Sequence, residues 1–84
     1  MMTLTETVSL MTSDDYRERF RAEYFQTKIR AQKLAAIVSA YERGEVDFTP
    51  QTPLLILQRQ LIQMLEYLST LALRAQFEGI SLED

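Results

Sequence analysis

The feature that most constrains this chain is one turn, between Gly44 and Pro53, that separates two long segments with helical periodicity. Glycine readily adopts the left-handed conformation that ends a helix, and proline suits the first position of a helix because its missing N–H is not needed there. Pro50 prevents a helix from continuing through the turn. The sequence therefore predicts helices over about residues 14–43 and 53–78.

Polar residues before each predicted helix can cap it. Ser13 and Thr52 are the predicted N-caps, because a side-chain oxygen accepts a bond from a free N–H of the first turn. Gly79 is predicted to end the second helix. Residues 1–12 have no clear period and are predicted to form a loosely ordered arm, followed by a helical domain over residues 13–84.

Apolar residues recur at three- and four-residue steps and give each predicted helix one stripe. The stripes are Tyr16, Phe20, Tyr24, Thr27, Ala31, Leu34, Val38 and Tyr41 in the first helix, and Leu54, Leu57, Leu61, Met64, Leu65, Leu68, Leu71, Ala72 and Ala75 in the second. When two such stripes face each other they form an antiparallel helical hairpin. The predicted fold class is therefore all-α.

Both predicted helices have more apolar surface than one hairpin can bury. Phe25 and Ile29 lie nearly opposite the main stripe of the first helix, and Ile62 and Leu73 lie away from that of the second. Large exposed apolar patches usually mark interfaces. These four residues are the predicted oligomer interface, and the predicted assembly is a homo-oligomeric helical bundle, with a dimer as its simplest form.

The composition argues against most catalytic and metal-binding classes. The 84 residues include no cysteine and no histidine, so disulfides, thiolate metal sites and the commonest general base are absent. No group of acids has the spacing of a calcium loop. With no glycine-rich loop either, the sequence predicts a non-enzymatic protein without a metal or cofactor.

The chain has neither a signal-peptide pattern nor an apolar run approaching the roughly 20 residues of a membrane span. It is therefore predicted to be soluble and cytoplasmic. Its net charge of −3 hides a local excess of cations, since six of the nine basic residues lie between Arg17 and Lys33. This distribution argues against duplex nucleic acid, whose partners are usually basic overall, and favours a small polyanion or an acidic patch on a neighbouring subunit.

Aromatic and basic residues alternate along the first helix and form the main candidate binding site. Aromatic rings stack on bases, and cations, arginine above all, bind phosphate. The candidates in this zone are Tyr16, Arg17, Phe20, Arg21, Tyr24, Lys28, Arg30 and Lys33. The structural alternative is that the rings belong to the core stripe and the cations form an ordinary solvated face.

Two further residues extend this candidate site. Thr49, in the turn before the second helix, is a candidate anion ligand because helix N-termini bind anions; the alternative is simple helix termination. Arg74 would return beside Tyr16 in an antiparallel hairpin and complete an anion pocket. Its alternative is an intrahelical pair with Glu78, one turn later.

Several short motifs support a family resemblance. They are Tyr16-x-Glu18-Arg19-Phe20-x-x-Glu23-Tyr24 and Lys28-x-Arg30-x-x-Lys33-Leu34 in the first helix, Phe48-Thr49-Pro50-x-x-Pro53 in the turn, and Leu54-Leu55-x-x-Gln58 and Met64-x-x-Tyr67-Leu68-x-x-Leu71-x-x-Arg74 in the second helix. Over roughly residues 14–80 this pattern resembles a family of small helical-hairpin proteins encoded by phages and prophages, some described by relation to a crAss-like phage protein.

The hairpin is also similar to that of phage sponge proteins that sequester the cyclic nucleotide signals of the CBASS and Thoeris defence systems. The resemblance implies an accessory phage protein that counters host defence, oligomerises through its hairpins and binds ligands between subunits. None of the sponges' ligand-contacting residues is transferred to this chain.

Two functional hypotheses follow. In the first, the protein sequesters a nucleotide-derived signal, such as a cyclic nucleotide or an ADP-ribose derivative, at a subunit interface. In the second, it is a protein–protein interaction module whose surplus apolar faces block a host defence protein or a phage protein. A purely structural bundle with no ligand is the remaining alternative.

Overall fold

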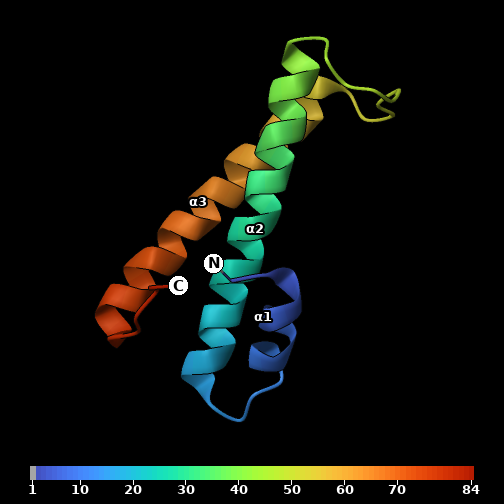
Figure 1. The fold of residues 1–84 in the computed structure, drawn as a ribbon. Coiled ribbons are helices and arrows are strands. Elements are labelled where there is room, and N and C mark those ends of the chain that lie inside the picture. The colour runs from blue at the N-terminus through green and yellow to red at the C-terminus, as the bar shows by residue number, and fades with distance from the viewer. Residues whose placement is uncertain (1) are drawn as a thin grey trace.

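The computed structural model describes residues 2–84, which form three α-helices and contain no strand. The helices are α1 (Leu4–Met11), α2 (Tyr16–Glu42) and α3 (Leu54–Glu78), so the predicted all-α class is confirmed. α2 and α3 run in opposite directions from the loop that joins them, and α1 lies beside the other end of α2 (Figure 1). The described chain is elongated, with principal extents of 43 × 24 × 19 Å.

α2 begins two residues later than predicted. Its N-cap is Asp15, whose Oδ1 accepts a hydrogen bond of 2.9 Å from the N–H of Arg17. The predicted cap, Ser13, instead accepts a bond of 3.0 Å from the N–H of Asp15. Ser13 therefore shapes the approach to the helix, and the aspartate places its charge at the positive end of the helix dipole.

The two glycines end α2 and α3 as predicted. Gly44 and Gly79 have φ angles of 69° and 66°, in the left-handed region that glycine adopts without steric cost. The start of α3 differs from the prediction. Pro53 occupies the N-cap position and no side chain caps the helix, so Thr52 is not the cap.

The first twelve residues are not the loosely ordered arm that was predicted, because most of them form α1. Thr3 is the N-cap, and its Oγ1 accepts a hydrogen bond of 3.3 Å from the N–H of Glu6. Thr7 is fully buried, and its hydroxyl donates a bond of 2.6 Å to the carbonyl of Leu4. The buried polar group is therefore satisfied within the helix.

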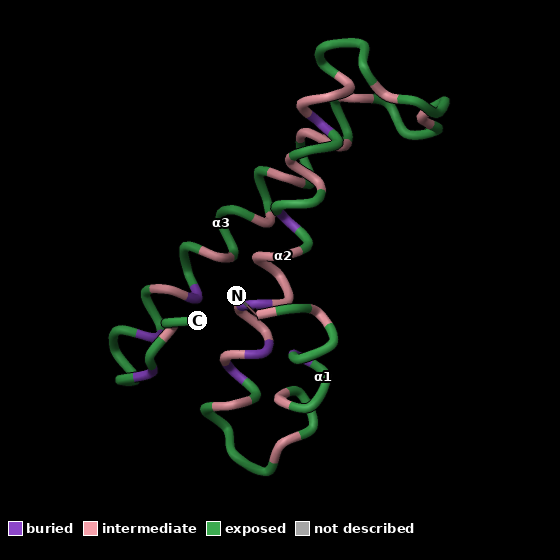
Figure 2. Tube along the Cα trace, viewed as in Figure 1, coloured by how far each residue is buried: buried purple, intermediate pink, exposed green. Residues whose placement is uncertain are grey.

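α2 lies between the other two helices and buries two opposite sides. It contacts both α1 and α3, which do not contact each other. On the side toward α3, Phe20 packs in a cluster with Leu71 and Ala75. Buried positions are spread along α2, whereas those of α3 lie near its end (Figure 2).

Burial within the chain corrects the prediction that Phe25 and Ile29 lie on an open interface. Phe25 is only 3% exposed, and Ile29 is half-buried. Ile29 also borders a groove of about 460 Å³ with the first residues of α1 and the segment before it, Met2–Leu4. The chain therefore covers part of this apolar face itself.

The outward side of α3 has no covering element in the described chain. Ile62 and Leu73, the other two predicted interface residues, are 56% and 54% exposed, and Phe77 is 90% exposed. The large apolar side chains that share this side are Leu55, Ile62, Leu65, Leu73 and Phe77. The homo-oligomeric bundle stays a prediction, and α3 is the helix that offers a surface for it.

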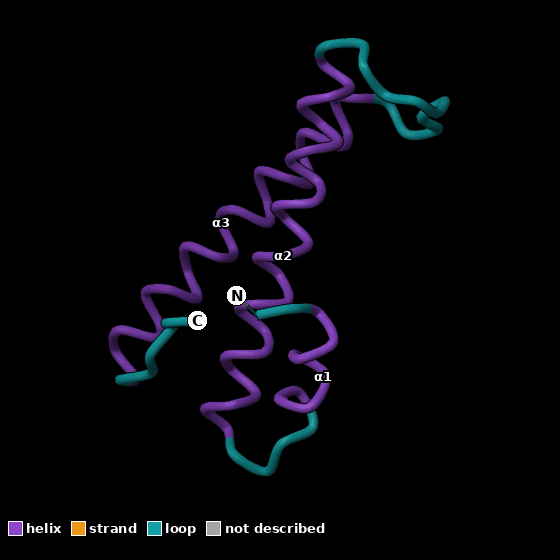
Figure 3. The backbone as a smooth tube through the Cα atoms, in the orientation of Figure 1, coloured by secondary structure: helices purple, strands orange, loops and turns teal. Residues whose placement is uncertain are grey.

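After Gly79 the chain leaves α3 and turns back toward the middle of the molecule as a loop (Figure 3). Ile80 is 8% exposed in the cluster formed with Phe20, and Leu82 packs against the same cluster. Residues 79–84 therefore contribute to the core. Among the described residues, none of the helices has the length and apolar character needed to cross a membrane.

Candidate functional site

The predicted basic zone is divided between two sides of α2. Arg21 and Lys28 are seven residues apart, close to two helical turns, so they share one side. Arg30 follows Arg21 by nine residues, two and a half turns, and therefore lies on the opposite side. Lys28 borders a hollow between α2 and α3, whereas Lys33 borders the groove beside α1. One ligand cannot be held by all four cations of a single chain.

We call Arg17, Arg21, Tyr24 and Lys28 the cationic face, since their three- and four-residue spacing places them along one side of α2. Arg17 is exposed, and the other three are partly buried. The Nζ of Lys28 lies 5.9 Å from the centroid of the Tyr24 ring, within the range of a cation–π contact. The cationic face thus combines an aromatic ring with three cations.

Beside Tyr24 and Lys28 lies a hollow of about 250 Å³, which we call the α2–α3 hollow. It is lined by Tyr24, Lys28, Ala31, Gln32, Ala35, Leu61, Leu65 and Leu68. The two alanines leave space where larger side chains would fill the gap between the helices. The result is a largely apolar hollow with one ammonium group in its lining, which suits a flat apolar group attached to an anion.

Arg21 is already engaged by the end of the described chain. Its Nη1 donates to the carbonyl of Ser81, and its Nη2 donates to the carbonyl of Glu83 at 2.9 Å. Its guanidinium carbon also lies 5.3 Å from the centroid of the Phe25 ring. The guanidinium therefore binds two acceptors at the edge of the cationic face.

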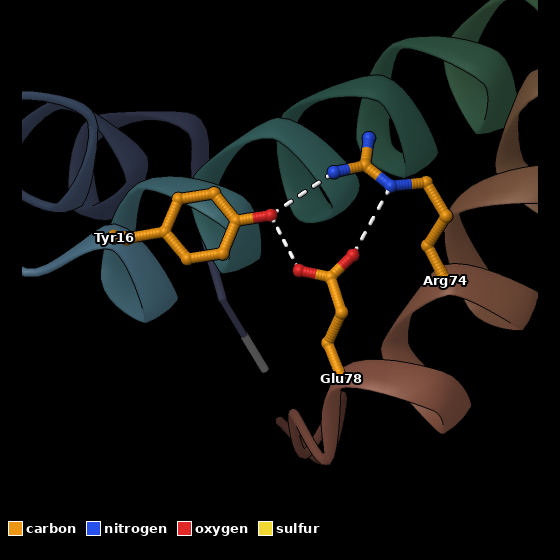
Figure 4. A network of polar contacts seen from close by, with 3 residues as sticks. All are labelled: Tyr16, Arg74 and Glu78. Carbon is orange, nitrogen blue, oxygen red and sulfur yellow. Dashed lines mark hydrogen bonds and ion pairs between the residues drawn. The ribbon is translucent and has the colours of Figure 1, made fainter.

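At the end of the α2–α3 pair that lies away from the connecting loop, Tyr16, Arg74 and Glu78 form a closed polar network (Figure 4). The Tyr16 hydroxyl donates to Oε1 of Glu78 at 2.5 Å. Arg74 donates from Nη2 to the tyrosine oxygen at 3.0 Å and from Nε to Oε2 of Glu78 at 3.3 Å. The prediction that Arg74 returns beside Tyr16 is confirmed, and its pair with Glu78 forms as well.

The network sets the protonation of its members. The hydrogen bond from Tyr16, joined by the bond from Arg74, holds the pKa of the Glu78 carboxyl below its ordinary value. The bond to Glu78 raises the pKa of the Tyr16 phenol. Both shifts favour a neutral phenol that donates to an ionised carboxylate. The carboxylate therefore occupies the position beside Arg74 that an anionic ligand would need.

All three predicted stacking rings pack within the fold, Tyr24 against the core cluster and edge-on to Phe25, and they differ in what they leave open. Phe20 is 2% exposed, and the Arg74 guanidinium carbon lies 5.0 Å from its ring centroid, so this ring offers no free face to a base. Tyr16 is held by Glu78, and its ring lies edge-on to Phe20 with 6.2 Å between centroids. Among the three, Tyr24 is the ring that borders the α2–α3 hollow.

Thr49 does not join the other candidates. It is exposed in the loop between α2 and α3, at the opposite end of the pair from Arg74 (Figure 1). The 27 residues of α2 span about 40 Å, which separates the two ends. No second element positions a ligand beside Thr49, so it is not part of the candidate site.

Sequence reasoning missed two participants. Glu78 was considered only as a helical partner of Arg74, although it also binds Tyr16. Residues 81–84 were not considered, and no local signal identifies them because their contacts join positions about 60 residues apart. Residues 2–84 contain no group of three histidine, cysteine, aspartate or glutamate side chains suited to a metal ion.

The fold and the site define a small all-helical protein in which an aromatic ring and cations border an apolar hollow. The chain belongs to the Sequestin family, whose family model matches residues 14–77, more than half of its length. The family's name indicates a sequestering, binding function. No curated protein and no solved structure matches the chain.

Proposed function

We propose that the protein is a non-enzymatic binding protein that sequesters a nucleotide-derived signalling molecule, such as a cyclic nucleotide or an ADP-ribose derivative. In this proposal it acts in the host cytoplasm as a phage-type inhibitor of defence signalling. Its membership of the Sequestin family supports a sequestering function. The observation that best supports a nucleotide is the contact between Lys28 and Tyr24 beside the α2–α3 hollow.

The chemistry of the cationic face matches the two parts of a nucleotide. The apolar α2–α3 hollow receives the base, which stacks against the ring of Tyr24. Lys28 and Arg21 then bind the phosphate groups through charge-assisted hydrogen bonds, which are shorter and stronger than neutral ones. The Tyr16–Arg74–Glu78 network lies outside this arrangement, because Arg74 is already neutralised by Glu78.

A second copy of the chain would complete the site. The hollow of about 250 Å³ is small compared with the roughly 300–1,000 Å³ of most ligand pockets. Leu65 lines this hollow yet is 52% exposed, and it borders the outward side of α3 that includes Ile62 and Leu73. A copy packed on that side would therefore also enclose the ligand. This arrangement places the signal at a subunit interface.

The test uses two charge-reversed double variants that change the net charge equally. Arg21→Glu/Lys28→Glu reverses the cationic face, whereas Arg30→Glu/Lys33→Glu reverses the opposite side of α2. Isothermal titration with a panel of cyclic di- and trinucleotides and ADP-ribose derivatives gives the affinities. We expect the first variant to weaken binding about a hundredfold or more, since two charge-assisted contacts are lost, and the second to change it less than about threefold.

Several outcomes contradict the proposal. If both variants fold and weaken binding equally, the ligand responds to overall charge and the cationic face is not its site. If the unmodified protein binds nothing in the panel, nucleotide sequestration is wrong. Native mass spectrometry of the same samples reports the subunit count, and a monomer that binds a nucleotide contradicts the interface part of the proposal alone.

The exposed side of α3 favours one further candidate function, the blocking of a host defence protein or a phage protein. Phe77 and Leu55 are 90% and 73% exposed, which suits an apolar protein partner as well as a second copy. A chain that stays monomeric and binds no nucleotide would favour this function. Loss of a purified partner on Phe77→Ser, with an unchanged helical spectrum, would support it.

A further inference from the structure

The segment that follows α3 is anchored at its first residues, and its later residues contact the cationic face at Arg21. Gly79 reverses the chain, and the N–H of Ile80 donates to the carbonyl of Ala75 at 2.9 Å. Ile80 is 8% exposed in the core cluster, and Leu82 packs against that cluster. Residues 79 and 80 are thus fixed to the core, whereas 81–84 lie on the surface of α2 except for the partly buried Leu82.

Residues 81–84, which we call the strap, are held by two backbone carbonyls, by the packing of Leu82 against the core cluster and by the Asp84 carboxylate. The Arg21 guanidinium donates to the carbonyls of both Ser81 and Glu83. Further along, a carboxylate oxygen of Asp84 accepts a bond of 2.8 Å from the N–H of Met2. Because Met2 also borders the groove beside Ile29, the strap runs along α2 from Arg21 toward the level of Lys28.

The two carbonyl contacts resemble what a phosphate would offer. A guanidinium has a planar fork of N–H groups that binds two oxygens at once, as in its pairs with carboxylates and phosphates. The strap presents two oxygens to that fork, but both are uncharged carbonyls. A phosphate would replace them with charged acceptors and form stronger bonds. The position on Arg21 is therefore one that an anion can take from the strap.

The strap also adds negative charge to a face that would receive an anion. Glu83 and Asp84 are both exposed acids in its last two positions. While the strap lies on α2, these charges repel a phosphate that approaches Lys28. Displacement of the strap would remove that repulsion and free Arg21 in the same step.

We propose that the strap is a tethered occupant of the phosphate position on Arg21, and that the phosphate of a bound nucleotide displaces it. This inference rests on the proposed nucleotide-binding function and adds its regulation. The exchange involves residues 81–84 and withdraws Leu82 from the edge of the core cluster, whereas Ile80 stays buried. An occupant on the same chain competes at a high effective concentration, so the strap lowers the affinity for the ligand and raises the selectivity for groups that offer two charged oxygens.

The main test compares the full chain with a variant that ends at Ile80. Each is titrated with the nucleotide of the panel that the full chain binds most tightly. We expect removal of the strap to lower Kd about tenfold, since two intramolecular hydrogen bonds no longer compete. The matched control is Glu83→Gln/Asp84→Asn, which removes the charges but keeps the backbone carbonyls. Its Kd should fall by only about twofold.

A second measurement uses the full chain and does not depend on the stability of the shortened one. The NMR chemical shifts of the carbonyl carbons of Ser81 and Glu83, whose oxygens accept from Arg21, are measured with and without the nucleotide. Displacement predicts that both shifts change when the ligand binds, together with slower amide exchange around Tyr24. Unchanged carbonyl shifts on binding would overturn the proposal even if the shortened chain unfolds.

The two proposals fail in different ways. If the full chain binds a nucleotide but the shortened, folded chain binds it no more tightly, the strap is structural and the cationic face keeps its proposed function. If neither form binds any nucleotide of the panel, the proposed function fails and the strap proposal is overturned with it. Weaker binding by a folded shortened chain would mean that the strap is part of the site, which also contradicts displacement.

Discussion

α2 and α3 are nearly equal in length, at 27 and 25 residues, yet they bury their side chains very differently. α2 has five buried residues, and two of them, Phe20 and Phe25, lie on nearly opposite sides. α3 has two, Leu71 and Ala75, both in its second half. Seven large apolar side chains of α3 are exposed, against two of α2, Tyr16 and Ile37.

The difference shows that burial in this chain follows position in the fold more than composition. Among the three helices of residues 2–84, α2 is covered on one side by α1 and on the other by α3, whereas α3 contacts α2 alone. The helix with more apolar residues therefore keeps more of them in solvent. Any self-association driven by apolar surface is expected to use α3, and variants of the two helices should separate chain stability from assembly.

The largest expected contrast is between two phenylalanines. Phe25→Ala should lower the free energy of unfolding by about 3–5 kcal/mol, because it leaves a cavity at a position that is 3% exposed. Phe77→Ala, at a position 90% exposed, should change it by less than about 0.5 kcal/mol. Urea unfolding at low protein concentration measures both. Equal losses would mean that Phe25 and Phe77 do not differ in burial in solution.

Phe77→Ala has a second readout that Phe25→Ala lacks. If α3 mediates assembly, the variant should lower the mass measured by light scattering while the helical spectrum is unchanged. If the oligomer is unaltered, Phe77 is not part of the interface, and Ile62 and Leu55 are the next residues to substitute.

Two leucines on α3 provide the next contrast. Leu71 is fully buried between the helices, so Leu71→Ala should cost about 2–5 kcal/mol of stability. Leu73, two residues later, is 54% exposed, and Leu73→Ala should cost less than about 1 kcal/mol. Thermal unfolding of the monomeric form distinguishes them. A Leu73 variant as unstable as the Leu71 variant would show that the outward side of α3 is covered in solution.

Substitutions at the two glycines test whether the ends of α2 and α3 contribute equally to the stability of the chain. A Cβ added at Gly44 or at Gly79 meets no atom within 4 Å, so the cost of alanine comes only from the left-handed backbone. Each substitution should lower stability by about 1–2 kcal/mol. Only Gly79→Ala should also speed hydrogen exchange at Ile80, because that turn places Ile80 in the core. Equal exchange in the two variants would mean that the segment is anchored without its turn.

Much of the fold was predictable because its signals are local. Gly44 and Gly79 end α2 and α3 where the sequence predicts. The three- and four-residue spacing of apolar residues along each helix also places Phe20 and Leu71, two members of the buried cluster, on the predicted stripes. α1 was missed although Thr3 and Glu6 have the spacing of a capping box, which predicts a helix start. Phe25 was assigned to an interface because the contacts that bury it come from outside the two predicted stripes.

The candidate site was predictable only in part. The sequence predicts which residue types form it, and the placement of Arg21 and Arg30 on opposite sides of α2 follows from helix geometry once the helix is known. The burial of Phe20 and the binding of Arg21 by the strap depend on contacts between distant parts of the chain. Such contacts have no sequence period, so the pattern of residues cannot reveal which ring or cation stays available.

The smallest expected effect concerns pH and again compares positions on α3. The pKa of Glu78 is lowered by the bonds from Tyr16 and Arg74, so its ionised form favours the folded state. This contribution is fully present above the ordinary carboxyl pKa and is lost as pH falls through the lowered value. The pKa of Tyr16 is raised by the bond to Glu78, so its contribution is present below a pH of about 10 and is lost as pH rises further.

Stability should therefore be flat through neutral pH and fall at both extremes, and Glu78→Gln should reduce both slopes while preserving the side-chain size. Glu66→Gln is the matched control, because Glu66 is an exposed acid on the same helix and has no side-chain contact to Tyr16. Unfolding midpoints measured from pH 3 to 11 give the comparison. If the two variants have the same pH profile, the Tyr16–Arg74–Glu78 network does not contribute to the stability of the chain.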